Sequence, residues 1–228
     1  MEGVTVRDGK ELAAAIIEHI HDAAREAIRT TGGFRVALSG GSLVSILNNP
    51  LFRDSPSASY DKWTVFLADE RCVPLDDSES TYGMYLSEMP DFVSKVNFPV
   101  PYGTGIPEDA ARQYGALLDR ALDLVVLGIG PDGHTASLFP PASAAMAGST
   151  ERVEVVHNSP KPPATRITMT LPYLCTGNQI AFVVTGAGKA EKIRQILFDH
   201  DASLPPSAIN RTGKARWFLD YSAASLLQ

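Results

Sequence analysis

The chain has 228 residues, of which 44% are hydrophobic, enough for one large α/β domain or two small ones. The formal net charge is −6 at pH 7, and no run of Lys and Arg exceeds two residues, which disfavours nucleic acid and anionic membranes as partners. Any anionic ligand must therefore be bound by a few individually placed cations.

Targeting and redox signals are sparse in this sequence. No basic start followed by an apolar segment is present, and no apolar run approaches the roughly 18 residues of a membrane span. Cys72 and Cys175 do not suggest a disulfide framework in a chain of this size and are expected to be small buried side chains. We therefore expect a soluble, cytoplasmic protein.

The amino-terminal part of the chain predicts a long helix followed by a strand. Asp8 is placed to cap a helix whose apolar residues, from Leu12 to Ile28, share one face. The breaker at residues 30–33, with two glycines, ends that helix. A strand is expected next, at residues 34–38.

The glycine turn at residues 39–42 has the form of an anion-binding site. It lies between the strand at residues 34–38 and a helical pattern at residues 43–47. Glycines let the backbone approach an oxyanion closely, and the N–H groups of a helix amino terminus attract it. An ordinary strand-to-helix turn has the same pattern, so both interpretations stand at this point.

Three charged residues follow the next strand, which is expected at residues 63–68 after a loop at 49–61. Asp69, Glu70 and Arg71 are costly at the end of an apolar strand unless they are solvated or paired. They indicate either a surface salt-bridge cluster or a site at the strand end. Further along, we expect a helix at residues 79–89, a loop or edge strand at 97–107 and a helix at 107–120.

The strongest functional signal follows the apolar run at residues 124–127, which is short enough for a strand buried on both faces. Three glycines and Pro131 follow and predict that this strand ends in a tight loop. The loop presents Asp132 and His134 at the carboxyl end of a central strand, where open α/β sheets bind their ligands.

The same loop also matches the dinucleotide-binding fingerprint, with Gly128, Gly130 and Gly133 at the required spacing. That mechanism needs a long helix whose amino terminus holds the pyrophosphate. Pro140 and Pro141 stop the segment after Gly133 within a few residues. The sequence therefore disfavours dinucleotide binding.

The last third of the chain continues the alternation of strands and helices. Lys189 lies in the first turn of a predicted helix, where a cation opposes the helix dipole, so it is either an anion ligand or a solvated lysine. Arg166 stands at the entrance of a strand. The expected strands are residues 153–157, 166–171, 179–185 and 215–219, and the expected helices are 190–198 and 221–227.

This alternation predicts an α/β fold, Rossmann-like, with a mostly parallel sheet covered by helices on both faces. We find no internal repeat and no linker, so residues 1–228 are expected to form a single domain. In such a sheet the glycine turn, the charged strand end, the Asp–His loop and the Gly–Lys turn all emerge on one edge. Their convergence favours one pocket over four unrelated surface features.

Six segments of the sequence carry a family resemblance. They are residues 38–42, 69–71, 79–83, 127–140, 166–172 and 188–190, in that order along the chain. Together they resemble the 6-phosphogluconolactonase family (the glucosamine-6-phosphate isomerase/6-phosphogluconolactonase family). The run from Gly130 to Pro140 is the most specific of the matches.

The resemblance implies hydrolysis of 6-phospho-D-glucono-1,5-lactone to 6-phosphogluconate, the second step of the oxidative pentose phosphate pathway. A δ-lactone is an activated ester, so water needs a positioned base, and an imidazole titrates near neutrality. We assign the base to His134 and its orientation to Asp132. The expected partner is a small sugar-phosphate lactone, no cofactor is expected, and the chain is expected to be a monomer or a weak homodimer.

The remaining candidates are binding residues. Arg166 and Lys189, with the N–H groups of the glycine turn, are expected to hold the 6-phosphate. Arg71 is expected to polarise the carbonyl or to contact the phosphate, and Asp69 to bind ring hydroxyls. The full expected binding set is Ser39, Gly40, Gly41, Ser42, Asp69, Arg71, Arg166 and Lys189.

No metal site is expected. His19 and His21 lie two residues apart on a helix and cannot share a face. His157 and His200 have no nearby Cys or His at ligand spacing.

Two other functions compete with the lactonase. A glucosamine-6-phosphate deaminase resembles this chain in its glycine turn, strand-end acid and histidine loop, but deaminases carry an Asn-Glu pair where this chain has Leu138 and Phe139. Ring opening of an amino sugar uses that extra carboxylate, which phenylalanine cannot replace. A non-catalytic sugar-phosphate binder would need the cations but not the Asp132–His134 pair.

Overall fold

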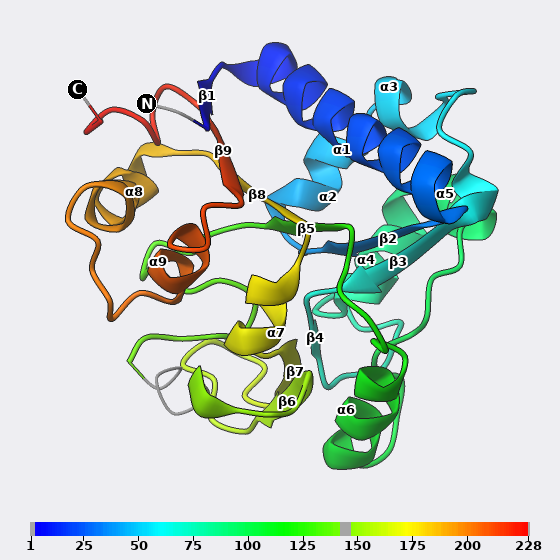
Figure 1. Ribbon diagram of the computed structural model, residues 1–228. Helices are drawn as coiled ribbons and strands as arrows, with labels where there is room; N and C mark the ends of the chain where they lie inside the picture. The colour runs from blue at the N-terminus through cyan, green and yellow to red at the C-terminus, as the bar shows by residue number, and fades with distance from the viewer. Residues whose placement is uncertain (1–2, 142–146, 228) are drawn as a thin grey trace.

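The computed structural model describes residues 3–141 and 147–227, and a parallel sheet of six strands forms its centre (Figure 1). The strand order is β1-β9-β8-β5-β2-β3, and every neighbouring pair is parallel. The mostly parallel sheet expected from the sequence is therefore confirmed. The strands of this sheet are β1 (Val4–Val6), β2 (Phe34–Leu38), β3 (Trp63–Leu67), β5 (Leu124–Leu127), β8 (Gln179–Val184) and β9 (Ala215–Leu219).

Helices cover both faces of the sheet, as Figure 1 shows. Alternation along each strand sends side chains to opposite faces: Val36 and Leu38 of β2 join one apolar cluster, and Ala37 joins the other. The helices on the first face are α1 (Gly9–Thr31), α2 (Ser42–Leu47), α3 (Pro50–Arg53), α4 (Thr81–Glu88) and α5 (Pro90–Lys95). Those of the second cluster are α6 (Pro107–Ala116), α7 (Leu171–Thr176), α8 (Ala190–Leu197) and α9 (Pro205–Asn210).

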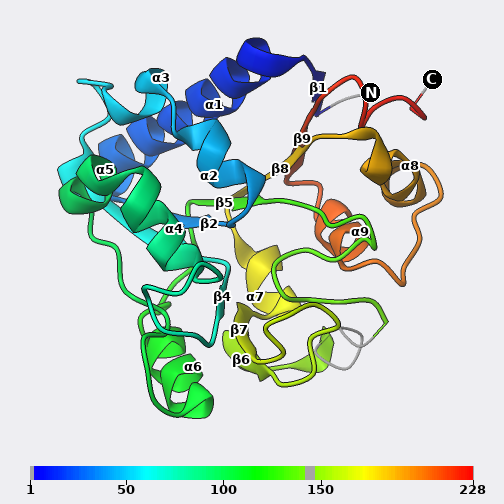
Figure 2. The same ribbon diagram turned by 180° about the vertical axis from the view of Figure 1, so that it is seen from behind.

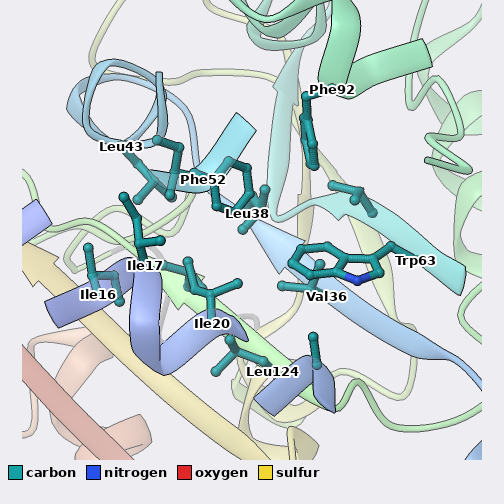
Figure 3. Packing of buried hydrophobic residues seen from close by; sticks show 14 of the residues in the cluster. Ile16, Ile17, Ile20, Val36, Leu38, Leu43, Phe52, Trp63, Phe92 and Leu124 are labelled. Carbon is teal, nitrogen blue, oxygen red and sulfur yellow. The ribbon is translucent and has the colours of Figure 1, made fainter. Parts of the chain in front are cut away.

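The first cluster is built around aromatic and branched side chains (Figure 3). Ile16 and Ile20 of α1 are fully buried on the helix face that the sequence predicts. Trp63 is buried at the start of β3, and its ring centroid lies 4.8 Å from that of Phe34 in edge-on geometry. This packing fixes α1 against β2 and β3, and so determines where the loop after β2 begins.

A second, smaller sheet lies on the side of α6 and α7 in both views (Figure 1, Figure 2). Its antiparallel strands are β4 (Asp69–Arg71), β7 (Arg166–Met169) and β6 (Val153–Val156), in the order β4-β7-β6. The sequence placed Asp69, Glu70 and Arg71 after a strand and not in one, and this prediction was wrong. Three consecutive charges carry no strand pattern, and β7 supplies the pairing from nearly a hundred residues away.

The ends of several elements test the sequence predictions directly. Asp8 accepts a hydrogen bond from the Gly9 N–H at 3.0 Å, and Gly32, with φ of 83°, ends α1, both as expected. Helix α6 stops at Ala116 instead of residue 120, and residues 221–226 form turns instead of a helix. Short helical patterns of this kind depend on tertiary packing for their extent.

Two connections and the cysteines also differ from expectation. The loop expected at residues 49–61 contains α3 and, at its end, the 3-10 helix η1 (Tyr60–Lys62). A second 3-10 helix, η3 (Ala187–Lys189), precedes α8. Cys72 and Cys175 are free thiols, as expected, but half-buried instead of fully buried.

Candidate active site

A cavity of about 190 Å³ lies where the parallel strands β2, β3, β5 and β8 end. It brings together every candidate residue from the sequence except Asp132, which contacts His134 from outside the cavity. The candidates in its wall are Ser39, Gly40, Gly41, Ser42, Asp69, Arg71, His134, Arg166 and Lys189. The convergence of separate strand ends on one pocket is thus a property of the structure.

The glycine turn after β2 is fixed by backbone requirements. Gly41 has φ of 64°, a left-handed conformation that favours glycine. A Cβ atom on Gly40 would lie 2.7 Å from Cγ2 of Thr81, so only glycine lets the turn pack against α4. The hydroxyl of Tyr85 donates to the Ser39 carbonyl at 2.8 Å and anchors the start of the turn.

Ser39 offers the cavity a polar group that is unpaired within residues 3–141 and 147–227. Its residue surface is only 7% exposed, and it lines the cavity. Among the residues that the structure describes, its Oγ finds no hydrogen-bond partner. A buried hydroxyl without a partner is costly, and a bound polar ligand removes that cost.

The loop after β5 holds His134 by its own hydrogen bonds. The Gly130 N–H donates to the His134 carbonyl at 2.9 Å, and the Thr135 hydroxyl donates to the Gly128 carbonyl at 2.8 Å. A Cβ atom on Gly130 would lie 2.0 Å from Cε1 of His134 and 2.6 Å from Oδ1 of Asp132. The imidazole therefore rests directly against the Gly130 backbone.

His134 and Asp132 form a close pair in which Nδ1 of the imidazole contacts Oδ1 of the carboxylate. The other face of the imidazole packs against Phe139, with ring centroids 4.5 Å apart. Burial lowers the pKa of His134, and the nearby carboxylate only partly offsets this, so the pKa lies below its ordinary value. Burial opposes ionisation of Asp132, but the His134 hydrogen bond and the charges of His134 and Lys161 hold its pKa below its usual range.

Arg71 and Arg166 face each other across β4 and β7, where their residues are direct cross-strand partners. Like charges directly opposite in a sheet are destabilising unless an anion lies between them. Burial, and then the charge of Arg71, lowers the pKa of Arg166, which is only 4% exposed. Arg71 is stabilised by Glu79, whose carbonyl accepts from Nη1 at 2.5 Å. The pair therefore forms a positively charged wall of the cavity.

Successive side chains of β4 point to opposite sides of the strand, which separates Asp69 from Glu70. Asp69 faces the cavity, and its Oδ2 accepts a hydrogen bond from the Ser137 hydroxyl at 2.6 Å. Glu70 is fully buried on the opposite side, where its carboxylate accepts the backbone N–H groups of Thr81 and Tyr82, each at 2.7 Å. Glu70 thus holds the amino terminus of α4 against β4 and does not line the cavity.

Lys189 reaches the cavity from the turn between β8 and α8. Gly186, with φ of 95°, begins the turn, and its N–H donates to the carboxylate of Asp220 at 2.9 Å. Burial lowers the pKa of Lys189, although Asp220 acts in the opposite direction. The cation expected at this turn is therefore placed in the site together with the two arginines.

Two residues near the site were missed by the sequence analysis. Thr81 lines the cavity from the start of α4, next to Gly40. Lys161 lies in the proline-rich connector before β7, and its Nζ lies 3.4 Å from Oδ1 of Asp132. Thr81 lies within a matched segment, 79–83, but that segment gave it no chemical role. Lys161 had no signal beyond its place five residues before Arg166.

The dinucleotide hypothesis finds no support in the loop geometry. After Gly133 the chain makes a bridge between Thr135 and Leu138, and not the long helix that a pyrophosphate needs. Across residues 3–141 and 147–227, no group of three His, Cys, Asp or Glu side chains is placed to hold a metal ion. Within the same residues, no helix has both the length and the apolar character to cross a membrane.

Comparison with known proteins defines the family. The model of the family described as glucosamine-6-phosphate isomerases/6-phosphogluconolactonase matches residues 7–217. A rat protein named 6-phosphogluconolactonase is 40% identical, over 96% of this chain and 90% of its own. The chain belongs to this family, and the resemblance expected from the sequence is confirmed.

Solved structures agree with this fold. The 6-phosphogluconolactonase of Trypanosoma brucei has a TM-score of 0.82 and 25% identity, with 100% of this chain and 99% of that chain covered. A monomeric glucosamine-6-phosphate deaminase has a TM-score of 0.78 and 22% identity, with 98% and 99% covered. Because both enzymes share the fold, only the site can distinguish the two activities.

We expect Gly130→Ala to displace the imidazole of His134, because the added methyl group would overlap Cε1 and Nδ1 of the ring. A crystal structure of the variant should show the His134–Asp132 contact broken while the six-stranded sheet is unchanged. Gly148→Ala is the matched control, since a Cβ atom there meets nothing within 4 Å. An undisturbed His134–Asp132 pair in Gly130→Ala would contradict the close approach.

Proposed function

We propose that this protein hydrolyses 6-phospho-D-glucono-1,5-lactone to 6-phosphogluconate, the reaction that the names of its relatives indicate, as a step of the oxidative pentose phosphate pathway. The observation that carries the proposal is that His134, paired with Asp132, faces the same cavity as Arg71, Arg166 and Lys189. One cavity thus offers a base for water and cations for a phosphate.

In the proposed reaction His134 is the general base. Because its pKa lies below the ordinary value, the imidazole is neutral at physiological pH and can accept a proton. Asp132 engages Nδ1, which leaves Nε2 as the ring nitrogen that takes the proton from water. The resulting hydroxide adds to the lactone carbonyl, and the ring oxygen then leaves and takes the proton back from the His134 imidazolium, while the new carboxylic acid releases its proton to solvent.

Asp132 supports this base in the manner of a triad carboxylate. Its charge stabilises the imidazolium that forms when water is deprotonated, and the contact with Nδ1 fixes the tautomer. The Gly130 backbone on one side and Phe139 on another hold the ring in place. A ring held by packing loses little orientational freedom when substrate binds.

The cationic wall of the cavity is proposed to bind the 6-phosphate. A dianionic phosphate beside Arg71 and Arg166 relieves the repulsion between these cross-strand neighbours, and Lys189 adds a third charge. Ser39 Oγ and the N–H groups of Gly40, Gly41 and Ser42 complete the hydrogen bonding. Asp69 keeps one oxygen for the sugar hydroxyls, since Ser137 occupies the other.

Phe139 supports a lactonase over a deaminase. It lies 5% exposed between the imidazole of His134 and the guanidinium of Arg166, whose Cζ is 5.6 Å from the ring centroid. This is the segment in which deaminases carry a carboxylate for ring opening. An apolar ring here provides no proton donor, whereas ester hydrolysis needs no second acid because the His134 imidazolium returns its proton to the leaving oxygen.

The direct test supplies the protein with fresh 6-phosphogluconolactone and, separately, with glucosamine 6-phosphate. We expect acid release above the spontaneous rate from the first substrate and no ammonia from the second. His134→Ala should lower kcat by about 10²–10⁴-fold, the usual contribution of a general base. His157→Ala is the control, because its side chain is 59% exposed and lies outside the cavity. Ammonia release, or a normal rate in His134→Ala, would contradict the proposal.

We expect Lys189→Ala to raise KM by about tenfold or more with little change in kcat. A charge-assisted hydrogen bond contributes about 1.5–3 kcal/mol, and the phosphate keeps this contact in both ground and transition states. Steady-state kinetics with the lactone measure the effect. Lys214→Ala is the matched control, because Lys214 is exposed and does not line the cavity. An unchanged KM would place the phosphate away from Lys189.

Ser39→Ala separates binding from stability. Because Ser39 Oγ is buried and has no partner among the described residues, its removal should not lower the free energy of unfolding and should raise it by up to about 1 kcal/mol. The same change should raise KM several-fold, since a neutral hydrogen bond to the substrate is lost. Urea unfolding and kinetics on the same preparation measure both. A destabilised variant with unaltered KM would show that the hydroxyl serves the fold.

A further inference from the structure

Lys161 reaches the Asp132–His134 pair from a separate segment of the chain. Its Nζ lies 3.4 Å from Oδ1 of Asp132 and 3.3 Å from Nδ1 of His134. No motif of the sequence assigned it a role, and the proposed reaction does not use it. An ammonium group this close to a general base changes the electrostatics of the base.

We propose that Lys161 is a positioning residue that completes a three-membered cluster, in which its ammonium group holds Asp132 ionised and keeps the imidazole of His134 neutral and ready to accept a proton. The inference rests on the proposed role of His134 as the base. It goes further by adding a lysine outside the cavity wall to the burial that already favours the neutral form of that base.

The backbone that carries Lys161 is fixed in place. Arg166 donates hydrogen bonds to the carbonyls of Lys161 at 3.1 Å, Pro162 at 2.9 Å and Pro163 at 3.2 Å. The Ser159 hydroxyl donates to the Lys161 carbonyl at 2.7 Å. Prolines restrict the remaining backbone freedom of the connector. The backbone at Lys161 is therefore held in place, and the ammonium group at the end of its partly exposed side chain is positioned by its contacts with Asp132 and His134.

Asp132 is the hydrogen-bond acceptor at the centre of the cluster. An ammonium group only donates, and Nδ1 of an imidazole that acts through Nε2 also donates. Both donors therefore share Oδ1 of Asp132, the acceptor within reach of each. Shared in this way, the carboxylate orients the ring but attracts the imidazolium less strongly than it would alone.

The charges around His134 act in opposite directions. Asp132 on its own loop and Asp69 on β4 favour the imidazolium, while Lys161 from the connector and burial of the ring disfavour it. Arg71, Arg166 and Lys189 line the same cavity and add positive charge. Of the cations, Lys161 is the one in direct contact with the pair. Its removal therefore has a defined sign: the imidazolium becomes more stable and the pKa of His134 rises.

The test compares Lys161→Met, which removes the charge, with Lys161→Arg, which keeps it. We expect the acid limb of the kcat/KM profile to move to higher pH by about one unit in Lys161→Met, the size of a Coulomb interaction at this distance in a water-like medium. Rates at alkaline pH should stay near normal. Lys161→Arg should keep the limb in place, as should the control Lys214→Met at an exposed position.

An NMR titration of the His134 imidazole in the ligand-free protein measures the pKa of His134 directly and does not depend on enzymatic activity. The midpoint should rise in Lys161→Met and stay unchanged in Lys161→Arg. An unshifted midpoint in Lys161→Met overturns the inference, whether kcat falls at every pH or KM rises. If the unmodified protein has no lactonase activity, the proposed function fails, and the titration still decides the role of Lys161.

Discussion

Parallel strand pairing is the constraint on which the site depends. In the six-stranded sheet every strand runs in the same direction, so the segments that follow β2, β3, β5 and β8 emerge at one edge. The segment after β2 contributes backbone N–H groups, and the one after β3 contributes Asp69 and Arg71. The segment after β5 contributes the Asp132–His134 pair, and the one after β8 contributes Lys189. Other elements separate these segments from one another in the sequence, and the segment after β3 is itself strand β4 of the smaller sheet. The parallel sheet therefore fixes where each of these segments begins.

The small antiparallel sheet adds a second constraint. By pairing Arg71 with Arg166 it concentrates positive charge on one wall of the cavity. Arg166 also uses three of its donor contacts to tie down the connector that carries Lys161. The cationic wall and the imidazole pair are thereby linked through one buried side chain.

Much of the fold could be predicted because apolar runs and caps are local signals. The strands at residues 34–38, 124–127 and 215–219 have the boundaries that their apolar pattern predicts, and the Asp8 cap of α1 forms as expected. The clustering of the glycine turn, the His134 loop and Lys189 followed from the parallel sheet, whereas the place of Arg166 beside Arg71 comes from the small antiparallel sheet. Their individual roles remain predictions, since geometry shows contact and not chemistry.

The features that the sequence did not predict arise from contacts between distant segments. Strand β4 consists of three charged residues and exists because β7 pairs with it. Lys161 acquires a partner only because Arg166 folds its connector back toward the loop after β5. Thr81 enters the cavity wall because Gly40 leaves space for it. In each case the residue has an ordinary local pattern, and its surroundings are supplied by another part of the chain.

The shared crevice for base and phosphate is tested most directly by a crystal structure of the protein with 6-phosphogluconate, the stable product. The phosphate oxygens should lie within about 4 Å of the charged groups of Arg166 and Lys189, the range of a salt bridge. The carboxylate formed from the lactone carbonyl should lie beside Nε2 of His134. A product bound outside the cavity, or one with its phosphate on His134 and its carboxylate on the arginines, would contradict the proposed arrangement.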